Sequence, residues 1–428
     1  MKKHIIIIIL LIVFEACSSI SNEKIKIELA SKLDTNKSIA FTKAKALEIM
    51  KSGFNAGDGY REVWIRDYNT FIELAAKVHP AEELKANLII FFKLQGSDGN
   101  IIDGFTPRED TEINYDFTYS DLAPNYAGHK NSVETDQETS LIQAIYKYIN
   151  LTGDKAFLDE IIGGKTVAER MEWAMDYLIE NRFSDEYGLI WGATTVDWGD
   201  VQPEHSWGVD IDENTHRAID IYDNAMFIIA LDNLMEMLPK TVTKWSPVKN
   251  RLIKNCREHL WDINNQKFIP HIYLNGSPFP KDFNENEIFY FGGTTIAIEA
   301  GLLTNNEILS SINKMVELIK KAGATSIGLT IYPAYPEGFF KDKGMYPYGY
   351  QNGGDWTWFG GRMTQQLVKY GFLEKAYEQL LPMTERVLKN NGFFEWYTIN
   401  NEPRGSGTFR GSAGVLFVAI EMFEIEIF

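Results

Sequence analysis

Residues 140–154, SLIQAIYKYINLTGD, place apolar side chains three to four positions apart and end at Gly153. Residues 372–392, FLEKAYEQLLPMTERVLKNNG, repeat this pattern and end at Gly392. Such spacing puts the apolar side chains on one face of an α-helix, and glycine is common just beyond a helix C-terminus. Both stretches therefore predict helices, the second with a kink at Pro382.

The same periodicity covers most of the chain, and no convincing series of β-hairpins competes with it. We therefore predict an all-α fold, although short strands can still occur inside the longer linkers. The pattern predicts twelve helices, at residues 41–52, 68–79, 81–96, 132–152, 155–180, 216–237, 244–260, 294–302, 306–321, 356–370, 372–389 and 408–425.

The linkers between these helices alternate between short and long. Structureless linkers as long as the long ones are rare in compact domains unless they are functional. A ring of six helical hairpins would produce this alternation and would gather all the long linkers at one end. We predict a single (α/α)6 barrel over residues 38–428, with a deep pocket built by these linkers. An α-solenoid would show a repeated sequence motif, and we find none. The long linkers are residues 53–67, 97–131, 181–215, 262–293, 322–355 and 390–407.

The N-terminus predicts export. Two lysines precede an apolar run that ends at Phe14, and Ala16 stands before Cys17. This is typical of a bacterial signal peptide over residues 1–16, and Cys17 resembles the lipid-modified first residue of a lipoprotein. An ordinary signal with an incidental cysteine is the alternative. We expect a membrane-anchored exported protein, periplasmic or at the cell surface, with a polar tether at residues 17–37.

The amino-acid composition indicates which kinds of binding partner to expect. The formal net charge is −17, and aromatic residues make up 13% of the chain. Such a surface repels nucleic acid, whereas acids and aromatics together suit neutral sugars. Asp210, Asp212 and Glu213 lack the full spacing of a calcium loop, and the histidines show no HExxH pattern. We expect a monomer that binds an oligosaccharide and needs no metal or other cofactor.

Candidate site residues cluster in and beside the long linkers. YREVWIRDYNTF contains Trp64, Arg66 and Asp67, and SVETDQETS contains Asp136. An aromatic face beside a carboxylate suits a sugar, which stacks on one and hydrogen-bonds to the other. Asp67 could instead cap a helix, and acidic residues favour helix N-termini in any case.

Three later clusters extend this set. The linker GLIWGATTVDWGDVQPEHSW is unusually rich in tryptophan and aspartate, YPYGYQNGGDWTWFGGRM places amides beside tryptophans, and a glutamate stands between aromatic residues after the eleventh helix. Neighbouring aromatic residues raise the pKa of a carboxyl group, and a neighbouring arginine lowers it. The candidates are Trp191, Asp197, Trp198 and Asp200, then Tyr222 and Asn224, then Gln351, Asn352, Asp355, Trp356 and Trp358, and finally Glu395, Arg404 and Arg410.

The order and spacing of these motifs resemble the six-hairpin glycosidases related to glucoamylases, bacterial amylo-1,6-glucosidases and exo-α-1,6-mannosidases. The landmarks are WIRD, EYGLIWG and a late glutamate before Pro-Arg-Gly, from about Gly59 to the C-terminus. The resemblance implies an inverting, metal-free enzyme in which Asp67 binds the terminal sugar. It implies Asp200 as general acid, with Asp197 as the alternative, and Glu395 as general base. The segment 332–363 does not follow those families closely, which leaves the sugar and the linkage open.

The sequence therefore predicts an inverting exo-glycosidase that acts on oligosaccharides, with α-linkages favoured. Other enzymes on such a barrel are alternatives. A phosphorylase would need cations beside Glu395, which Arg404 or Arg410 could supply, and a lyase would use a tyrosine or histidine base. A non-catalytic glycan-binding lipoprotein is the third hypothesis.

Overall fold

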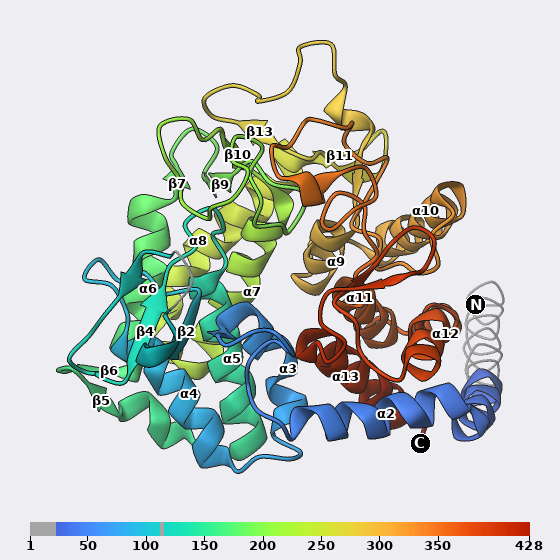
Figure 1. Ribbon diagram of the computed structural model, residues 1–428, viewed down its shortest axis with the longest axis horizontal. Coiled ribbons are helices and arrows are strands. Elements are labelled where there is room, and N and C mark those ends of the chain that lie inside the picture. The colour runs from blue at the N-terminus through green and yellow to red at the C-terminus, as the bar shows by residue number, and fades with distance from the viewer. Residues whose placement is uncertain (1–22, 112–114) are drawn as a thin grey trace, which may run out of the picture.

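The computed structural model describes residues 23–111 and 115–428 (Figure 1). The expected signal peptide and the lipid-modified Cys17 lie outside these residues. The described chain is mostly helical, and each predicted helix has a counterpart. The long helices are α2 (Lys37–Met50), α3 (Ile65–Ala75), α4 (Ala81–Lys93), α5 (Gln137–Thr152), α6 (Val167–Asn181), α7 (Ile221–Met237), α8 (Val242–Asn255), α9 (Phe291–Glu299), α10 (Asn305–Ala322), α11 (Thr357–Lys369), α12 (Leu373–Asn390) and α13 (Arg410–Ile427).

One predicted helix is divided. Residues 155–180 were expected to form a continuous helix, but the structure has a short 3-10 helix (Lys155–Asp159), a hairpin of β5 (Ile161–Ile162) and β6 (Lys165–Thr166), and then α6. The two residues at the hairpin turn are Gly163 and Gly164, both with positive φ, a conformation that glycine adopts without strain. A capping box between Thr166 and Glu169 then starts α6.

The expected polar tether is also partly helical. Residues 23–35 form a helix in which Leu29 and Leu33 are only 3% and 6% exposed. These leucines are four residues apart and share one helix face, so the segment can pack against the body of the protein. Lys26 adds an ion pair with Glu426 at 2.6 Å. The prediction of a tether over residues 17–37 is therefore wrong from residue 23 onward.

The helices pack in two layers. Helices α3, α5, α7, α9, α11 and α13 each contact the next in that order, and α13 also packs against α3. The other long helices contact this inner set: α4 and α6 pack against α5, α8 against α7, α10 against α9, α12 against α11, and α2 against α12 and α13 (Figure 1). Each inner helix follows a long linker, so the N-termini of the inner helices and the linkers meet on the same side.

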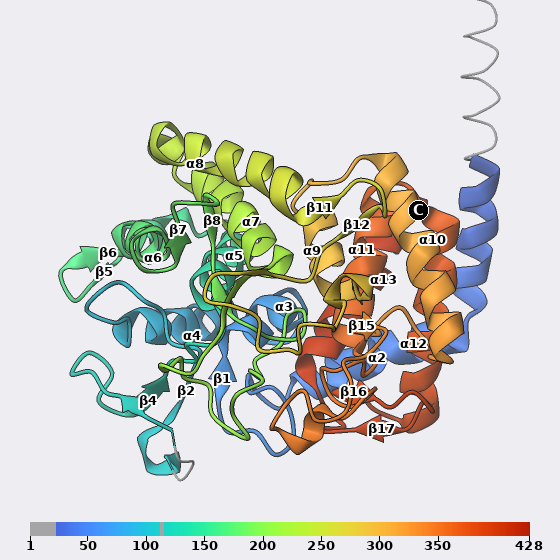
Figure 2. The same cartoon turned by 90° about the horizontal axis from the view of Figure 1, so that it is seen from above.

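Short antiparallel strands tie consecutive linkers together. In one sheet β1 (Val63–Trp64) pairs with β2 (Gly104–Pro107), and β2 pairs with β4 (Tyr126–His129), which also pairs with β3 (Phe117–Thr118). Figure 2 shows β1, β2, β4, β16 and β17 on one side of the helices. The remaining strands are β7 (Phe183–Ser184), β8 (Leu189–Ile190), β9 (Gly192–Ala193), β10 (Arg217–Ile219), β11 (Trp261–Asp262), β12 (Lys267–Phe268), β13 (Ile272–Tyr273), β14 (Phe289–Tyr290), β15 (Ile331–Tyr332), β16 (Trp396–Tyr397) and β17 (Pro403–Arg404).

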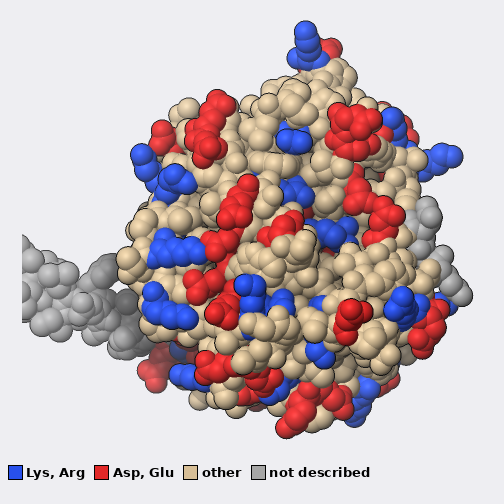
Figure 3. All heavy atoms as spheres, turned by 90° about the vertical axis from the view of Figure 1, so that its left-hand side faces the viewer, with Lys and Arg blue, Asp and Glu red and all other residues tan. Residues whose placement is uncertain are grey.

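Charged side chains of both signs are interspersed on the face that Figure 3 shows, with neither sign gathered into one large patch. Among the residues that the structure describes, no helix is long and apolar enough to cross a membrane.

Candidate active site

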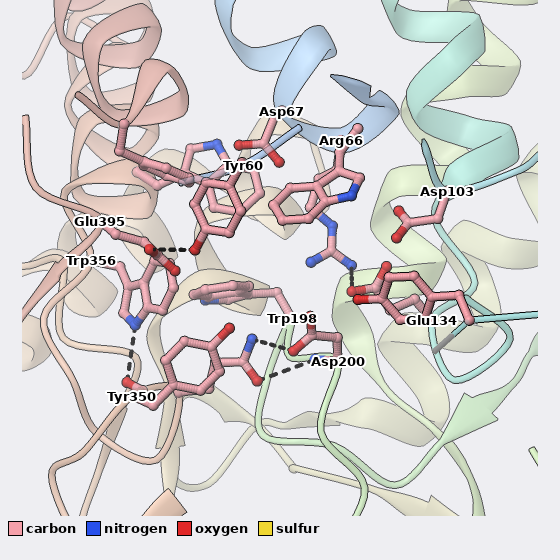
Figure 4. A pocket seen from close by; sticks show the side chains of 15 residues that line it. Tyr60, Arg66, Asp67, Asp103, Glu134, Trp198, Asp200, Tyr350, Trp356 and Glu395 are labelled. Atoms are coloured by element: carbon pink, nitrogen blue, oxygen red, sulfur yellow. Dashed lines mark hydrogen bonds and ion pairs between the residues drawn. The ribbon is translucent and has the colours of Figure 1, made fainter. Parts of the chain in front are cut away.

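A cavity of about 240 Å³ lies among the long linkers at the N-terminal ends of inner helices (Figure 4). Its lining combines carboxyl groups, aromatic rings and an arginine. The lining residues come from the linkers before α3, α5, α7, α11 and α13 and from the first turns of α3 and α11. They are Tyr60, Trp64, Arg66, Asp67, Asp103, Tyr115, Glu134, Trp198, Asp200, Tyr350, Gln351, Trp356, Trp358, Glu395 and Phe409.

Each of the two carboxyl groups predicted to be catalytic lines this cavity. Figure 4 shows Glu395 and Asp200 on different sides of it. Seven of the predicted sugar contacts line it as well: Trp64, Arg66, Asp67, Trp198, Gln351, Trp356 and Trp358. Segments far apart along the chain thus meet at one place, because the paired strands hold their linkers together.

Glu395 is held through one of its oxygens. The Tyr60 hydroxyl donates to Oε2 at 2.7 Å, and the Ser406 amide donates to the same oxygen at 3.3 Å. Gly405 has a positive φ, and a Cβ there would lie 2.7 Å from the Cβ of Glu395, so only glycine lets the chain pass so closely. Burial raises the pKa of Glu395 and the negative charge of Asp200 adds to this, while the bonds from Tyr60 and Ser406 lower it.

Asp200 is held by an amide side chain. Gln351 donates from Nε2 to Oδ1 at 2.7 Å and accepts from the Asp200 backbone amide at 3.2 Å (Figure 4). This two-point contact fixes the aspartate relative to the linker before α11. Oδ2 is the oxygen of Asp200 that these bonds leave for other partners.

Asp67 belongs to the first turn of α3 but does not cap the helix. The N-cap residue is Trp64, which makes no side-chain capping bond. Asp67 lines the cavity, and its Oδ1 is buried without a hydrogen-bond partner among the described residues. Burial raises the pKa of Asp67 to about 8, opposed by the charge of Arg66. The geometry favours a ligand contact over helix capping, because a buried oxygen without a partner is costly.

Arg66 is surrounded by acids. Its Nε donates to Asp136 at 2.7 Å, its guanidinium also pairs with Glu134, and the Tyr222 hydroxyl donates to Asp136 at 2.6 Å. Burial raises the pKa of Asp103, a further lining residue, to about 7, while Arg66 lowers it. Asp136 and Tyr222, predicted as sugar contacts, instead lie behind Arg66 and fix its orientation.

Aromatic rings form a wall of the cavity. Trp198 packs edge-on against Trp356 and Trp358, with ring centroids 4.8 and 5.4 Å apart, and stacks on Phe359 at 4.6 Å. The indole nitrogens of Trp198 and Trp358 are buried without a hydrogen-bond partner among the described residues. The rings therefore hold one another in place by direct packing.

The structure corrects the role predicted for Asp197. Its two carboxylate oxygens accept from the amides of Gly292 and Gly293, each at 2.6 Å, at the start of α9. It does not line the cavity described above. An acid at a helix N-terminus satisfies amides that have no partner within the helix. Asp197 is therefore a structural residue that fastens the linker before α7 to α9.

Three further predicted contacts are structural. Asp355 pairs with Arg386, with 2.9 Å between Oδ1 and Nη1. Asn352 exchanges hydrogen bonds with the backbone of Tyr335, and Asn224 does the same with Ile190. Their polar atoms are used in bonds within the protein, and none of the three side chains lines the cavity.

The remaining predicted residues also lie away from the cavity. Arg404 is exposed and pairs with Glu402, whereas Arg410 donates to the Asn55 carbonyl at 2.6 Å and joins α13 to the linker after α2. The Trp191 ring lies under two guanidinium groups, with 4.9 Å from its centroid to Arg182 Cζ and 4.7 Å to Arg217 Cζ. None of these three side chains lines the cavity.

Three lining residues lie outside the clusters quoted from the sequence: Asp103, Tyr115 and Phe409. Tyr60, Glu134 and Tyr350, which belong to the YREVWIRDYNTF, SVETDQETS and YPYGYQNGGDWTWFGGRM clusters, line the cavity as well. Tyr60 precedes Trp64 by four residues, so an aromatic residue just before the WIRD motif was an available signal. Asp103 lies in a short IIDGF stretch that has no distinctive spacing. No group of three or more metal-binding side chains occurs within residues 23–111 and 115–428.

Carboxyl groups and aromatic rings in one small cavity are typical of sites that act on carbohydrates. The chain belongs to the glycosyl hydrolase 94 superfamily, whose catalytic-domain model matches residues 19–384. This membership confirms the class of enzyme that the sequence predicted, a glycoside hydrolase. Glu395 and α13 lie beyond the matched residues.

One curated protein and several solved structures are also similar to this chain. Trehalase 1 of Sulfolobus acidocaldarius is 24% identical over 208 residues, which are 46% of this chain and 32% of that relative. A GH63 mannosylglycerate hydrolase from Thermus thermophilus, in complex with Tris and D-glycerate, superposes with a TM-score of 0.62 at 14% identity, over 88% of this chain and 99% of that one. A GH78 rhamnosidase of Bacillus sp. GL1 gives 0.61 at 13% identity, over 90% and 34%. The resemblance to six-hairpin glycoside hydrolases is thereby confirmed at the level of the fold.

Proposed function

We propose that the protein is an inverting, exo-acting glycoside hydrolase that releases the terminal sugar of an α-linked oligosaccharide. The placement of Asp200 and Glu395 on different sides of one small cavity carries this proposal. Inversion needs one carboxyl group to protonate the leaving oxygen and another to activate water on the opposite face of the sugar.

Glu395 is the general base. Tyr60 and Ser406 hold Oε2, which leaves Oε1 to take a proton from water as that water attacks the anomeric carbon. Asp200 is the general acid, because Gln351 occupies Oδ1 and Oδ2 can then deliver a proton to the glycosidic oxygen as the bond to the anomeric carbon breaks. The products are a free sugar of inverted configuration and a free hydroxyl on the leaving part.

A neutral sugar fits the lining best. Five carboxyl groups line the cavity against one arginine, and this arginine is already paired with acids, so the cavity offers an anionic sugar no unpaired cation. The carboxyl groups that line the cavity, together with the amide of Gln351, suit hydroxyl groups, which both donate and accept. The volume of about 240 Å³ lies below the roughly 300–1,000 Å³ of drug-sized pockets, which supports binding of a single terminal sugar.

A hydrolase fits better than a phosphorylase or a lyase. Arg404 and Arg410 are absent from the lining, and the lining arginine, Arg66, is already paired with Glu134 and Asp136. Inorganic phosphate would therefore meet an acidic surface. A lyase base would have to act on an acidic sugar, which the same carboxyl groups disfavour.

We propose three further properties from the sequence. The inner helices form a closed (α/α)6 barrel, which the contact between α13 and α3 supports. The chain is exported and anchored through a lipid on Cys17, since the N-terminal motif matches a lipoprotein signal. It acts as a monomer without a metal or another cofactor.

An NMR-monitored digest tests the activity. The panel contains α- and β-linked gluco- and manno-oligosaccharides together with trehalose, mannosylglycerate and α-rhamnosides, each with and without phosphate. Release of one sugar with inverted configuration, independent of phosphate, is the expected result. A retained configuration, a sugar phosphate or an unsaturated product would overturn the mechanism. Binding without turnover of any panel member would favour a glycan-binding protein.

A further inference from the structure

Three exposed apolar side chains lie together at the end of α13 that is remote from the cavity. Ile27 is 67% exposed, Ile425 81% and Phe428 72%. The 2.6 Å ion pair between Lys26 and Glu426 brings the two segments together, and Figures 1 and 2 both show the beginning of the described chain beside the end of α13. Single exposed apolar residues are ordinary, whereas apolar residues that gather on one surface mark an interaction site. We call these three residues the apolar patch.

We propose that the apolar patch rests in the interfacial layer of the membrane to which the chain is anchored, so that the protein is held there in one orientation. This inference rests on the proposed lipid on Cys17, and it does not depend on which sugar the enzyme cleaves. The partner of the patch is a lipid surface, because the anchor brings that surface to it.

The connection between the lipid and the folded protein is short. Glu23, in the helix over residues 23–35, follows Cys17 by six residues. Leu29 and Leu33 are buried, so this helix packs against the body of the protein and does not act as a tether. Six residues reach at most about 20 Å in any conformation, and the membrane surface must therefore lie within about 20 Å of Glu23. Ile27 lies only about one helical turn further along.

The charges beside the apolar patch do not oppose contact with lipid. An unpaired acid would be repelled by an anionic lipid surface. The acidic side chains near the end of α13 are paired with lysines instead: Glu421 and Glu424 with Lys43, and Glu426 with Lys26. These ion pairs leave the apolar side chains as the groups that a membrane would meet.

A neighbouring hollow extends the apolar surface. It has a volume of about 380 Å³, and Phe428 lines it together with Leu33, Ile39 and Leu47. Transfer of apolar surface out of water is favourable, and apolar faces of surface-bound proteins enter the boundary between headgroups and acyl chains to a depth of about 5–10 Å. No helix among residues 23–111 and 115–428 can cross a membrane, so this contact lies on the bilayer surface.

The position of the apolar patch keeps the catalytic cavity off the membrane. Phe409, directly before α13, lines the cavity, and the patch lies at the other end of this helix. The 18 residues of α13 span about 27 Å. A glycan can therefore reach Asp200 and Glu395 while the patch is seated on lipid.

Fluorescence quenching tests this orientation. The full chain, purified with its lipid, is placed in vesicles of phosphatidylethanolamine and phosphatidylglycerol that contain spin-labelled lipids. A fluorescent probe is attached to Ile425→Cys or to the matched control Ile161→Cys; the native thiols do not react, because Cys256 is buried and Cys17 is acylated. Ile161 is 74% exposed and belongs to β5, which Figures 1 and 2 show across the molecule from the beginning of the described chain.

We expect the probe at residue 425 to be quenched at least about threefold more strongly than the probe at residue 161, because only the former would enter the interfacial layer. Ile27→Asp, combined with the probe at residue 425, should lower this quenching about twofold or more, since a charged group resists transfer into that layer. Ile161→Asp should leave it unchanged. Equal quenching at the two probe positions, or equal effects of the two aspartate variants, would overturn the proposal.

The mass of the N-terminal peptide separates failure of the anchor from failure of the patch. If Cys17 carries no acyl group, the anchor fails and this inference fails with it, while the oligosaccharide digest still decides the hydrolase. If Cys17 is acylated but the probe at residue 425 is not preferentially quenched, only the patch is rejected. A dimer in detergent that Ile425→Asp dissociates would then assign the patch to a second copy of this chain.

Discussion

Asp197 and Asp200 are three residues apart in one linker, yet they serve different parts of the molecule. Asp197 turns inward and accepts two amide hydrogen bonds at the start of α9, whereas Asp200 lines the cavity and is held by the amide of Gln351. Asp197 also has a positive φ of 56°, and this backbone turn separates the directions of the two side chains. A motif rich in acids can therefore divide its residues between catalysis and support of the fold.

A similar division is seen among acidic residues from different segments. Asp67 lines the cavity while Asp136 holds Arg66, and Glu395 lines it while Asp355 binds Arg386. Supporting acids have both oxygens satisfied within the protein, but Asp67 keeps a buried oxygen without a partner. Substitutions of these residues can therefore test which acids act on a ligand and which support the fold.

Loss of either catalytic carboxyl group should have the largest effect. We expect Asp200→Asn and Glu395→Gln to lower kcat by about 10²- to 10⁴-fold, since each removes a proton transfer in the transition state. The thermal unfolding temperature should not fall, because neither carboxylate forms an ion pair within the described residues. Steady-state kinetics and calorimetry measure the two quantities. Wild-type turnover in either variant would remove that residue from its role.

Asp67→Ala should act mainly on binding. Two lost hydrogen bonds to a sugar, worth about 0.5–1.5 kcal/mol each, would raise KM by about 10- to 100-fold with a smaller change in kcat. Asp136→Ala is the informative comparison: because it frees Arg66 to move, it should lower kcat and stability together. If Asp67→Ala leaves both kinetic constants at wild-type values, the cavity does not bind sugar through this residue.

Tyr60→Phe should lower kcat by an intermediate amount and shift the pH dependence of kcat. The Tyr60 hydroxyl stabilises the ionised form of Glu395, so its loss raises the pKa of that carboxyl group. A general base must be ionised, and the acidic limb of the plot of kcat against pH should therefore move to higher pH, with kcat about tenfold lower at the optimum. An acidic limb that stays in place, or moves to lower pH, would show that Tyr60 does not act on Glu395.

The sequence predicts the helical architecture because amphipathic periodicity is a local property that packing preserves. It also locates the linkers that build the site, since most of the lining carboxyl groups and tryptophans lie in the acidic and aromatic clusters that the sequence shows. It could not decide which acid of a cluster faces the cavity, because the direction of Asp197 depends on the amides of Gly292 and Gly293 in α9, far along the chain. Asp103 was missed for a related reason: the pairing of β2 with β1 and β4 carries it to the cavity.

Asp197→Asn should have the smallest effect on catalysis and a clear effect on stability. Asparagine keeps one acceptor oxygen but turns an NH₂ group toward the second amide, so one of the two bonds to Gly292 and Gly293 is lost and a buried donor is left unpaired. Such a loss costs about 1–3 kcal/mol, which corresponds to about 1 °C per kcal/mol in unfolding temperature for a chain of this size. The folded fraction should keep a kcat within about threefold of the wild type, because Gln351 still holds Asp200. A loss of kcat as large as that of Asp200→Asn, at unchanged unfolding temperature, would instead make Asp197 the proton donor and reverse the assignment of the two aspartates.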